Sequence, residues 1–451
     1  MARFEIPYGK ISLPFDLPDA WDVHRVMPQP VEPVAEPRRT VEAALEAPVG
    51  GFSWSKVRQR GHSSAGAAAD GAASPGGPTV AIAVNDKTRP VPHGELLPPL
   101  LARLESHGVA RDHITLVIAT GTHPPMRPDE FTAILPADIV QRYRVVSHDV
   151  GDEDNLADLG TTSRGTPVQV NRLFVEADLR IVIGNIEPHQ FMGYSGGVKS
   201  AVIGLAGRET INTNHAMMTL PGAMLGHFED NPARQDVEEM GRMLRVDLAL
   251  NAILNDHKKI VQVIAGEPTE VMRIGMPRVR ELYVVEVDEP FDFVIASPGG
   301  HPKDINVYQA QKGLAHASLI TRAQGEILLA AACPEGSGSK GYENWVSSRG
   351  SHEQALEDFE AEGFRIGPHK AFQIAREATR FRTTWVTDMS PREAERLLLD
   401  TAAGIDEAVA AVRARHPEWA PGGSARPRVG IMPVANATIA GVGGAGGESE
   451  E

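Results

Sequence analysis

Short apolar runs alternate with helical segments along most of the chain after residue 78. Residues 79–85, 114–120 and 179–185 are rich in β-branched and aliphatic side chains, which is typical of strands buried in a parallel sheet. Residues 94–108, between the first two runs, have the composition of a helix. Because strands alternate with helices, the pattern predicts an α/β fold built on mostly parallel sheets.

A second unit of the same design begins near residue 291. Residues 291–300 form an apolar run that ends in a Gly-rich loop, and residues 304–317 follow with a helical pattern. Residues 325–336 repeat the strand and the Gly-rich loop. The remaining predicted elements are an irregular, partly extended segment at 1–55, strands at 246–254 and 259–266, helices at 268–283, 351–361, 367–380 and 390–414, and a last strand near 430.

A chain of 451 residues is long for a single core, so two domains are expected. We predict an N-terminal α/β domain at residues 1–285 and a C-terminal α/β domain at residues 290–415, with the functional site in the cleft between them. A last strand within residues 427–441 could return to the N-terminal domain. Residues 58–78 are rich in Gly, Ala and Ser, which predicts a disordered insertion.

The composition argues against several kinds of partner. A net charge of −15 argues against nucleic acid, because affinity for a phosphate backbone rests on Lys and Arg. Cys333 is the one cysteine, so neither an intrachain disulfide nor a zinc site of cysteine ligands can form. The chain has no signal-peptide pattern and no apolar run of membrane-spanning length. We expect a cytoplasmic protein without a membrane partner, and a homo-oligomer remains possible.

Two histidines directly follow predicted strands. His123 lies in GTHPP after the second strand, and His189 lies in IEPHQF after the third. The carboxyl ends of parallel strands share one edge of a sheet, so the two loops are expected to converge. A lone loop histidine is more often a solvated bystander. Two imidazoles that face one crevice, however, suit proton removal and return on opposite sides of a substrate, as a racemase requires.

SGGVKS, at residues 195–200, resembles a phosphate-binding turn. Gly196 and Gly197 would let backbone N–H groups approach an anion, the following helix N-terminus would add its dipole, and Lys199 would add charge or an amine for covalent attachment. The spacing of a Walker A loop is absent, and no strand ends in GxGxxG. The alternative is a Gly-rich turn with an exposed lysine.

Other polar residues suggest roles for a third loop and for two helices. Asp86, Thr88 and Arg89 follow the first strand, where an arginine fork can bind carboxylate or phosphate or can pair on the surface. His215 lies on a predicted helix. It could bind a metal that takes its further ligands from elsewhere, or it could be a buried histidine with a structural role. Tyr308 and Lys312 lie four residues apart, on one face of a helix that could close over an anion or could simply be solvated.

Five motifs, taken in order, resemble the lactate racemase family that uses a nickel-pincer nucleotide. They are DKTRP, GTHPP, EPHQFMGYSGGVKS, TINTNH and VYQAQKG, and the resemblance extends over residues 79–380. Lys199 follows His189 by ten residues and precedes His215 by sixteen, which fits the family pattern. The order and spacing of the motifs are more specific than any one of them.

The resemblance implies a cofactor, the pyridinium-3,5-bisthiocarboxylic acid mononucleotide with nickel. Lys199 corresponds to the lysine that contacts it and in some members holds it covalently. His215 corresponds to the histidine ligand of nickel, whose other ligands are two sulfurs and a ring carbon of the cofactor. Asp86 is implied to lie near the cofactor. The enzymes that synthesise this cofactor would be transient partners.

The resemblance also implies a reaction, the racemisation or epimerisation of a 2-hydroxy acid by proton-coupled hydride transfer. One histidine takes the hydroxyl proton while the α-hydrogen moves as hydride to the cofactor, and the 2-keto acid takes hydride back on its other face. The residues implied as catalytic are His123, His189, Arg89 and Lys312; as cofactor-binding, Asp86, Thr88, Ser195, Gly196, Gly197 and Lys199; as metal-binding, His215; and as substrate-binding, Tyr308, Gln309 and Phe372.

The chain departs from the family pattern at three places. Phe372 stands where lactate racemases carry a tryptophan, Val198 makes GGVK from the family's GGRK, and the insertion before Thr79 is unusual. These differences leave open a 2-hydroxy acid that is bulkier or more polar than lactate. Two other classes remain from the residues alone: a zinc-type metal-dependent hydrolase or lyase that uses the same histidines, and a cofactor-binding protein without catalysis.

Overall fold

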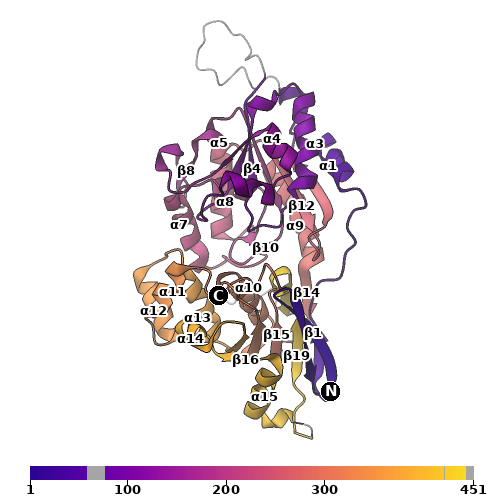
Figure 1. The fold of residues 1–451 in the computed structure, drawn as a ribbon, viewed down its shortest axis with the longest axis vertical. Helices are drawn as coiled ribbons and strands as arrows, with labels where there is room; N and C mark the ends of the chain where they lie inside the picture. Colours follow the sequence, from indigo (N-terminus) through magenta and orange to yellow (C-terminus); the bar gives the residue numbers. More distant parts are fainter. Residues whose placement is uncertain (58–76, 421, 443–451) are drawn as a thin grey trace. The chain divides into compact units, whose positions relative to one another are not determined.

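The structure is a computed structural model that describes residues 1–57, 77–420 and 422–442 (Figure 1). It contains two compact units: the N-terminal domain, Pro30–Glu281, and the C-terminal domain, formed by Met1–Gln29 together with Leu282–Glu451. The insertion predicted at 58–78 lies outside the described residues except for its last two positions. No helix in the described part of the chain is long and apolar enough to cross a membrane.

The N-terminal domain is built on a six-stranded sheet in the order β13-β12-β9-β4-β5-β6. All neighbouring pairs are parallel except β12 and β13, which are antiparallel. The strands are β4 (Val80–Asn85), β5 (Ile114–Ala119), β6 (Arg144–Ser147), β9 (Leu179–Asn185), β12 (Leu248–Leu254) and β13 (Ile260–Gly266). The apolar runs predicted as central strands are therefore confirmed.

Helices cover this sheet because its strands are apolar on both faces. On one face, α1 (Pro37–Glu46) and α3 (His93–Ser106) share a core with Ile82, Val84 and Ile118. Alternate residues such as Ala83 are equally buried, and the short helix α6 (Lys199–Val202) contacts β4 and β9. Apolar and polar residues therefore do not alternate along these strands, as expected for a parallel sheet that is covered on both faces.

The chain order of the strands creates a switch point at the centre of the sheet. From β4 the chain moves outward through β5 to β6, and it then returns to place β9 on the other side of β4. The switch point therefore lies between the neighbouring strands β4 and β9. In open α/β sheets, ligands bind at the carboxyl ends of the strands at such a point.

The C-terminal domain repeats this design with the order β18-β17-β16-β15-β19-β3, and all neighbouring pairs are parallel. Its strands are β3 (Asp22–Arg25), β15 (Phe291–Ala296), β16 (Thr321–Ala330), β17 (Arg382–Val386), β18 (Thr401–Ala402) and β19 (Arg428–Met432). Val294 and Ala296 point to one core, whereas Phe293 and Ile295 point to another. The sheet is therefore buried on both faces.

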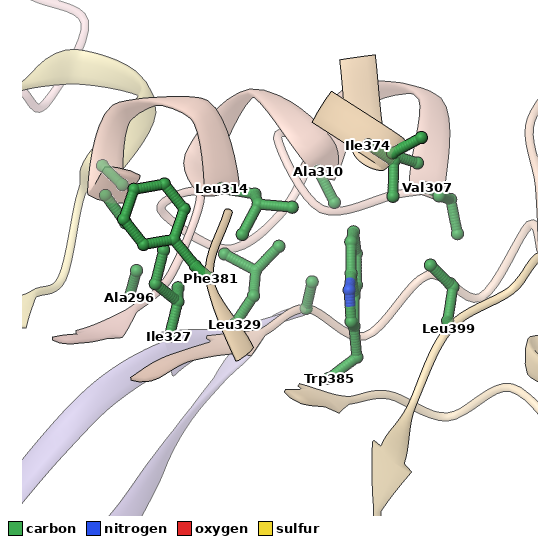
Figure 2. Packing of buried hydrophobic residues seen from close by; sticks show 14 of the residues in the cluster. Ala296, Val307, Ala310, Leu314, Ile327, Leu329, Ile374, Phe381, Trp385 and Leu399 are labelled. Atoms are coloured by element: carbon green, nitrogen blue, oxygen red, sulfur yellow. The ribbon is translucent and has the colours of Figure 1, made fainter. Parts of the chain in front are cut away.

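The first of these cores lies under α10 (Val307–Ser318) and α13 (Pro368–Ala378) (Figure 2). Trp385 of β17 is fully buried there, among side chains from both helices and from the sheet, including Val307, Ile374 and Leu399. The second core lies under α15 (Ile405–Arg415) and the hairpin of β1 (Ala2–Tyr8) and β2 (Ile11–Leu17). The first core packs α10 against the sheet.

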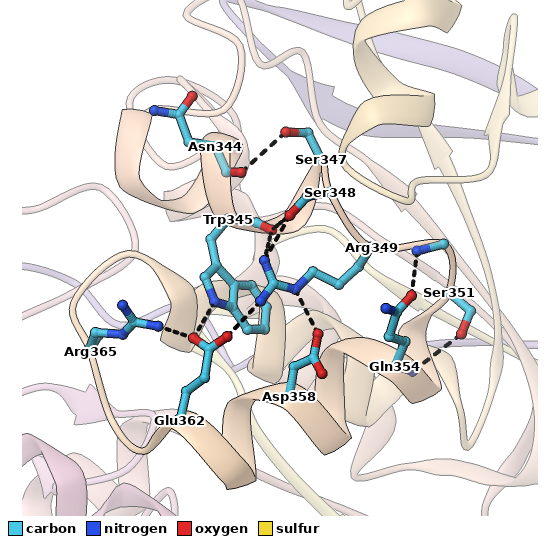
Figure 3. Close-up of polar contacts among 11 residues, drawn as sticks. Asn344, Trp345, Ser347, Ser348, Arg349, Ser351, Gln354, Asp358, Glu362 and Arg365 are labelled. Atoms are coloured by element: carbon cyan, nitrogen blue, oxygen red, sulfur yellow. Dashed lines mark hydrogen bonds and ion pairs between the residues drawn. The ribbon is translucent and has the colours of Figure 1, made fainter.

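A polar network joins α11 (Lys340–Val346) to α12 (His352–Glu362) beside the first core (Figure 3). The guanidinium of Arg349 lies 3.7 Å from the ring centroid of Trp345 and forms ion pairs with Asp358 at 3.0 Å and Glu362 at 2.8 Å. It also donates to the carbonyl of Trp345. One arginine side chain therefore fastens the turn between two helices.

Three expectations about domain and element boundaries were wrong. Residues 1–29 and the last strand belong to the C-terminal domain, because β3 and β19 pair with each other and β19 pairs with β15. The helix predicted at 390–414 is broken into α14 (Pro391–Arg396), β18 and α15, with Leu398 in the left-handed region at φ 59°. The N-terminal segment predicted as irregular contains α1 and a β-hairpin.

Candidate active site

The loop after β4 presents a buried carboxylate at the switch point. Asp86 is only 4% exposed. Its Oδ1 accepts hydrogen bonds from the Thr88 backbone N–H at 3.1 Å and from Thr88 Oγ1 at 2.6 Å, and its Oδ2 lies 2.7 Å from His123 Nδ1. Burial raises the pKa of Asp86, but the hydrogen bond and charge of His123, with help from Thr88 and Arg89, hold that pKa below its usual value overall. Asp86 is therefore an ionised acceptor.

His123 is held against this carboxylate by the turn that leaves β5. Its backbone N–H donates to Thr120 O at 3.0 Å, and its side chain is 39% exposed on the other side of the ring. Because Nδ1 donates to Asp86, the neutral ring carries its lone pair on Nε2. His123 can therefore accept a proton at Nε2 while Asp86 stabilises the resulting imidazolium.

His189 is held in the opposite protonation pattern. It lies in the short hairpin of β10 (Pro188–His189) and β11 (Gly193–Tyr194), which follows β9. The backbone N–H of Met192 donates to His189 Nδ1 at 3.3 Å, so the neutral ring carries its proton on Nε2. The loops on the two sides of β4 thus supply one imidazole ready to accept a proton and one ready to donate it.

The predicted phosphate-binding turn has a tighter internal structure than the sequence suggested. Ser195 is buried, and its hydroxyl donates to Asn185 O at 2.9 Å, so it braces the loop. The N–H of Gly197 donates to Asn251 Oδ1 at 2.7 Å and is not directed at an anion. Gly196 and Gly197 have φ of 89° and 59°, which only glycine adopts readily, and a Cβ on Gly197 would lie 2.8 Å from Met272 Cγ. The glycines are therefore required by backbone conformation and packing.

Lys199 is the residue of this turn whose chemistry is altered most. Burial lowers the pKa of its ammonium well below the usual value, and the nearby charges of Arg89 and Arg234 lower it further, against a smaller opposing effect of Glu187. A lowered pKa makes the amine of a lysine more readily available as a nucleophile. The helix that it opens, α6, has four residues, which is too short for the dipole that the sequence argument invoked.

Arg89 completes the first loop. Its Nη1 donates to Thr88 O at 3.3 Å and to Thr88 Oγ1 at 3.2 Å, and Thr88 Oγ1 in turn donates to Asp86. Its charge also lowers the pKa of Lys199, so Arg89 lies near enough to that lysine to influence it. The guanidinium is partly exposed and can bind an anionic ligand.

His215 lies on α7 (Arg208–Ala216) and is linked to His189 through an aromatic side chain. The ring of Phe191 lies 5.0 Å from that of His189 and 5.1 Å from that of His215, and both contacts are edge-to-face. Within the described residues, no group of three or more His, Cys, Asp or Glu side chains could hold a metal ion.

The C-terminal domain contains its own polar cluster on α10 and α13. Lys312 Nζ donates to Gln309 Oε1 at 2.9 Å, and Tyr308 Oη lies 3.5 Å from His369 Nε2. Lys370 Nζ lies 4.6 Å from the ring centroid of Tyr308. Tyr308, Gln309 and Lys312 therefore lie together, as their helical spacing predicted.

Phe372 lies deeper than the sequence analysis assumed. It is 9% exposed, belongs to the first core of the C-terminal domain, and stacks on Phe359 with ring centroids 4.8 Å apart. The neighbouring residues His369 and Lys370 are the ones that reach the Tyr308 cluster. The substrate contact predicted for Phe372 stays a prediction, and the contact that the structure shows for its ring is with Phe359.

The sequence analysis missed four residues that shape these sites. Arg234 is fully buried and donates to Tyr194 O at 2.9 Å and Gly196 O at 3.2 Å, which supports the Gly196–Gly197 turn from below. Phe191 lies inside EPHQFMGYSGGVKS and Lys370 lies two residues before Phe372, but neither had been given a role from the sequence. Asn251 lies on β12, where an amide inside an otherwise apolar strand was a signal that could have been used.

The donor set agrees with a cofactor that brings its own metal ligands. The N-terminal domain offers one imidazole at His215 and one amine of lowered pKa at Lys199. A pyridinium mononucleotide with two sulfur ligands and one carbon ligand needs one imidazole from the protein and an amine near its thiocarboxylate. The residues present therefore fit the group that the sequence resemblance implied.

Comparison with known proteins relates both domains to one family. Residues 8–226 match the family model described as the lactate racemase N-terminal domain, and residues 287–420 match the lactate racemase C-terminal domain. A lactate racemase from Thermoanaerobacterium thermosaccharolyticum is 32% identical over 379 residues, which cover 80% of this chain and 85% of that protein. A lactate racemase from Lactiplantibacillus plantarum is 30% identical and covers 76% of this chain and 77% of its own length.

Solved structures agree with these matches. The structure of the lactate racemase apoprotein from T. thermosaccharolyticum has a TM-score of 0.85 at 28% sequence identity, with 97% of this chain and 100% of that chain covered. A crystal structure of a protein from Thermotoga maritima has a TM-score of 0.66 at 18% identity and shows the same fold, with 92% of this chain and 100% of that chain covered. Both comparisons extend over the two α/β domains.

Proposed function

Since this chain belongs to the lactate racemase family and is a racemase, we propose that it inverts the C2 centre of a 2-hydroxy acid with the help of a nickel-pincer nucleotide. The observation that carries the proposal is the pair of histidines with opposite protonation patterns. His123 presents a lone pair on Nε2, and His189 presents a proton on Nε2. A hydroxyl proton can thus be taken by one ring and supplied by the other.

Two residues of the N-terminal domain would hold the cofactor. Lys199, whose pKa is lowered, would contact or covalently bind the thiocarboxylate group, and His215 would bind nickel. When bound, the cofactor supplies an acceptor and donor of hydride for the hydrogen on C2. Asp86 stays with His123 and Thr88 at the edge of this site.

The remaining steps belong to the side chains of the chain itself. Arg89 would bind the substrate carboxylate, because its fork matches two carboxylate oxygens. His123 takes the hydroxyl proton of one enantiomer at Nε2, and Asp86 stabilises the imidazolium. Nε2 of His189 supplies a proton when the hydroxyl forms again. His189 then regains a proton from solvent and the imidazolium of His123 releases one to solvent, so both rings return to their starting state. Tyr308, Gln309 and Lys312 of the C-terminal domain would also contact the substrate.

The test is to produce the protein together with the enzymes that synthesise the cofactor and to assay a panel of single-enantiomer 2-hydroxy acids. We expect about one nickel per chain and loss of optical purity for at least one acid. With substrate deuterated at C2, the product should keep its deuterium, because hydride is returned to the same molecule. Protein without nickel that racemises no acid would overturn the proposal, and complete loss of deuterium to solvent would overturn the hydride route.

The matched control is His215→Gln, which removes the proposed metal ligand and leaves both acid–base histidines in place. We expect this variant to fold and to carry nickel far below the wild-type ratio. Nickel at the wild-type level would contradict the role of His215 and leave the acid–base assignment standing.

A further inference from the structure

Asn214, the residue before His215 on α7, is fully buried and has its amide orientation determined by its neighbours. Its Nδ2 donates to Ala233 O at 2.9 Å and to Asp236 Oδ2 at 2.8 Å. A carbonyl and a carboxylate oxygen can only accept, so the NH₂ group must face them. The side-chain carbonyl Oδ1 therefore faces His215.

Asp236, on α8 (Pro232–Leu244), is held as an acceptor by two threonines. Its Oδ1 accepts from Thr162 Oγ1 at 2.6 Å, and its Oδ2 accepts from Thr166 Oγ1 at 2.8 Å. Thr162 Oγ1 already accepts from the Thr166 backbone N–H at 3.1 Å, which directs its own hydrogen to Asp236. Thr162 and Thr166 flank the turn between β7 (Leu156–Thr161) and β8 (Pro167–Asn171), so three elements converge on this buried carboxylate.

This chain of contacts determines the tautomer of His215. Asn214 Oδ1 lies 3.3 Å from His215 Nδ1 and can only accept a hydrogen bond, so Nδ1 must carry the proton. The lone pair of the neutral ring is then on Nε2. Phe191 packs edge-to-face against the same ring and limits its rotation. Histidine ligands of metals are commonly oriented in this way, by a hydrogen bond from the nitrogen that does not bind the metal.

We propose that Asn214, oriented by Asp236, is a positioning residue that keeps Nε2 of His215 unprotonated and available to a metal. The inference rests on the proposed function, because it takes His215 to be the nickel ligand. Asn214 lies within the TINTNH motif, but neither it nor Asp236 had been given a role from the sequence. Asn214 itself touches neither cofactor nor substrate in this role.

The first experiment measures the tautomer without any metal. Protein produced without the cofactor and labelled with ¹³C at histidine Cδ2 reports the tautomer through the Cδ2 chemical shift, and His215→Gln identifies the His215 signal. At a pH at which the ring is neutral, we expect the Nδ1-protonated form in the wild type. We expect a mixture of tautomers in Asn214→Leu, which keeps a similar volume and removes the acceptor.

Thr166→Val is the matched control, because it removes a buried hydrogen bond from the same network and leaves the Asn214–His215 contact in place. Both variants should lose stability, but only Asn214→Leu should change the tautomer. Asp236→Asn keeps an acceptor for Asn214 and should also keep the wild-type tautomer. If Asn214→Leu fails to fold, Asp236→Leu offers a second route, because it frees the Asn214 amide to turn over.

The second experiment measures nickel per chain after co-production with the cofactor-synthesis enzymes. Loss of a residue that orients a metal ligand typically lowers metal affinity about 10–100-fold, and we expect that range for Asn214→Leu but not for Thr166→Val. An unchanged tautomer in Asn214→Leu, or a wild-type ring protonated on Nε2, would overturn the inference alone. If the tautomers are as expected but the wild-type protein takes up no nickel, the proposed function is wrong, and Asn214 then has no role in metal binding.

Discussion

Single hydrogen bonds decide what each histidine near the switch point can do. His123 and His189 are the same residue type after two strands of one sheet, yet a carboxylate faces Nδ1 of the first and a backbone N–H faces Nδ1 of the second. Their protonation patterns are therefore opposite. The functional difference lies in partners that are 37 residues away for His123 and three residues away for His189.

Replacing Asp86 with Asn tests the first of these partners. The amide would no longer stabilise a positive charge on His123 and would allow the ring to take the wrong tautomer. We expect kcat for racemisation to fall about 10²–10⁴-fold with nickel content retained. The measurement is steady-state racemisation by polarimetry or chiral chromatography, beside nickel analysis. A variant with wild-type kcat would show that the Asp86–His123 pair has no part in proton transfer.

Lys199 should make stability depend on pH in a definite direction. Its pKa in the folded protein is lowered by burial and by neighbouring cations, so between that pKa and about 10.4 the unfolded chain binds more protons than the folded one. The free energy of unfolding therefore rises with pH through this window. In Lys199→Met this contribution is absent, so the variant should exceed the wild type in stability most at the lower pH values.

Urea unfolding of the cofactor-free protein at several pH values from neutral to about 10 measures this effect. The difference in the free energy of unfolding between Lys199→Met and wild type should shrink as pH rises. Lys259→Met is a suitable control, because Lys259 lies outside this site and has no comparable burial. A gap that stays constant or widens with pH would show that Lys199 is protonated normally in the folded state.

At the scale of elements, the local sequence pattern predicted some strands and helices correctly and missed others. Strands β4, β5 and β9, helix α10 and helix α13 were predicted within a few residues of their ends, because apolar runs and helical spacing are local signals. The break at residues 397–404 was missed, because the sequence there still resembles a helix. Only pairing of Thr401–Ala402 with β17 makes that segment extended.

The Arg349 network gives a test at this scale. Arg349→Leu would leave Asp358 and Glu362 without their shared partner and the Trp345 carbonyl without its donor (Figure 3). Because the Arg349 side chain is mostly buried, we expect a loss of about 2–3 kcal/mol in the free energy of unfolding of the C-terminal domain. The measurement is chemical denaturation followed by tryptophan fluorescence.

Arg365→Leu is the matched control, because Arg365 also pairs with Glu362 but is exposed. An exposed ion pair contributes about 0–1 kcal/mol, so this variant should stay near wild type. Equal losses in the two variants would show that Arg349 acts only as another surface charge.

At the scale of the whole molecule, the chain begins and ends in the same domain. Residues 1–29 supply β3 to the edge of the C-terminal sheet, and they supply Phe15, Leu17 and Trp21 to its second core. Trp21 Nε1 donates to Trp419 O at 3.0 Å, which links the N-terminal segment directly to the short helix Pro417–Trp419. The N-terminal domain is therefore inserted between the two parts of the C-terminal domain.

Deleting residues 1–29 should consequently destabilise the C-terminal domain, although most of that domain follows residue 281. Loss of each large buried side chain costs about 2–5 kcal/mol, and a domain is stable by only about 5–15 kcal/mol in total. We expect the C-terminal domain to become sensitive to proteolysis while residues 30–57 and 77–281 remain protected. Limited proteolysis with mass spectrometry measures this difference. Selective cleavage within residues 77–281 would contradict the assignment of residues 1–29 to the C-terminal domain.

The sequence by itself determined the α/β class, the central strands of both sheets and the family, because these depend on local apolar patterns and on motifs of fixed order. It also placed His123, His189 and Lys199 on loops at one edge of a sheet. It could not assign residues 1–29 and the last strand to their domain, because strand pairing between distant segments leaves no local signal.

Only the tertiary structure decided how the chemistry of these residues is set. The opposite tautomers of the two histidines, the lowered pKa of Lys199 and the oriented amide of Asn214 all come from partners brought close by folding. Protonation depends on the nearest charges, hydrogen bonds and burial, and the sequence does not state which groups those are. The sequence alone identified the residues of the candidate site, whereas their protonation states are determined by the folded structure.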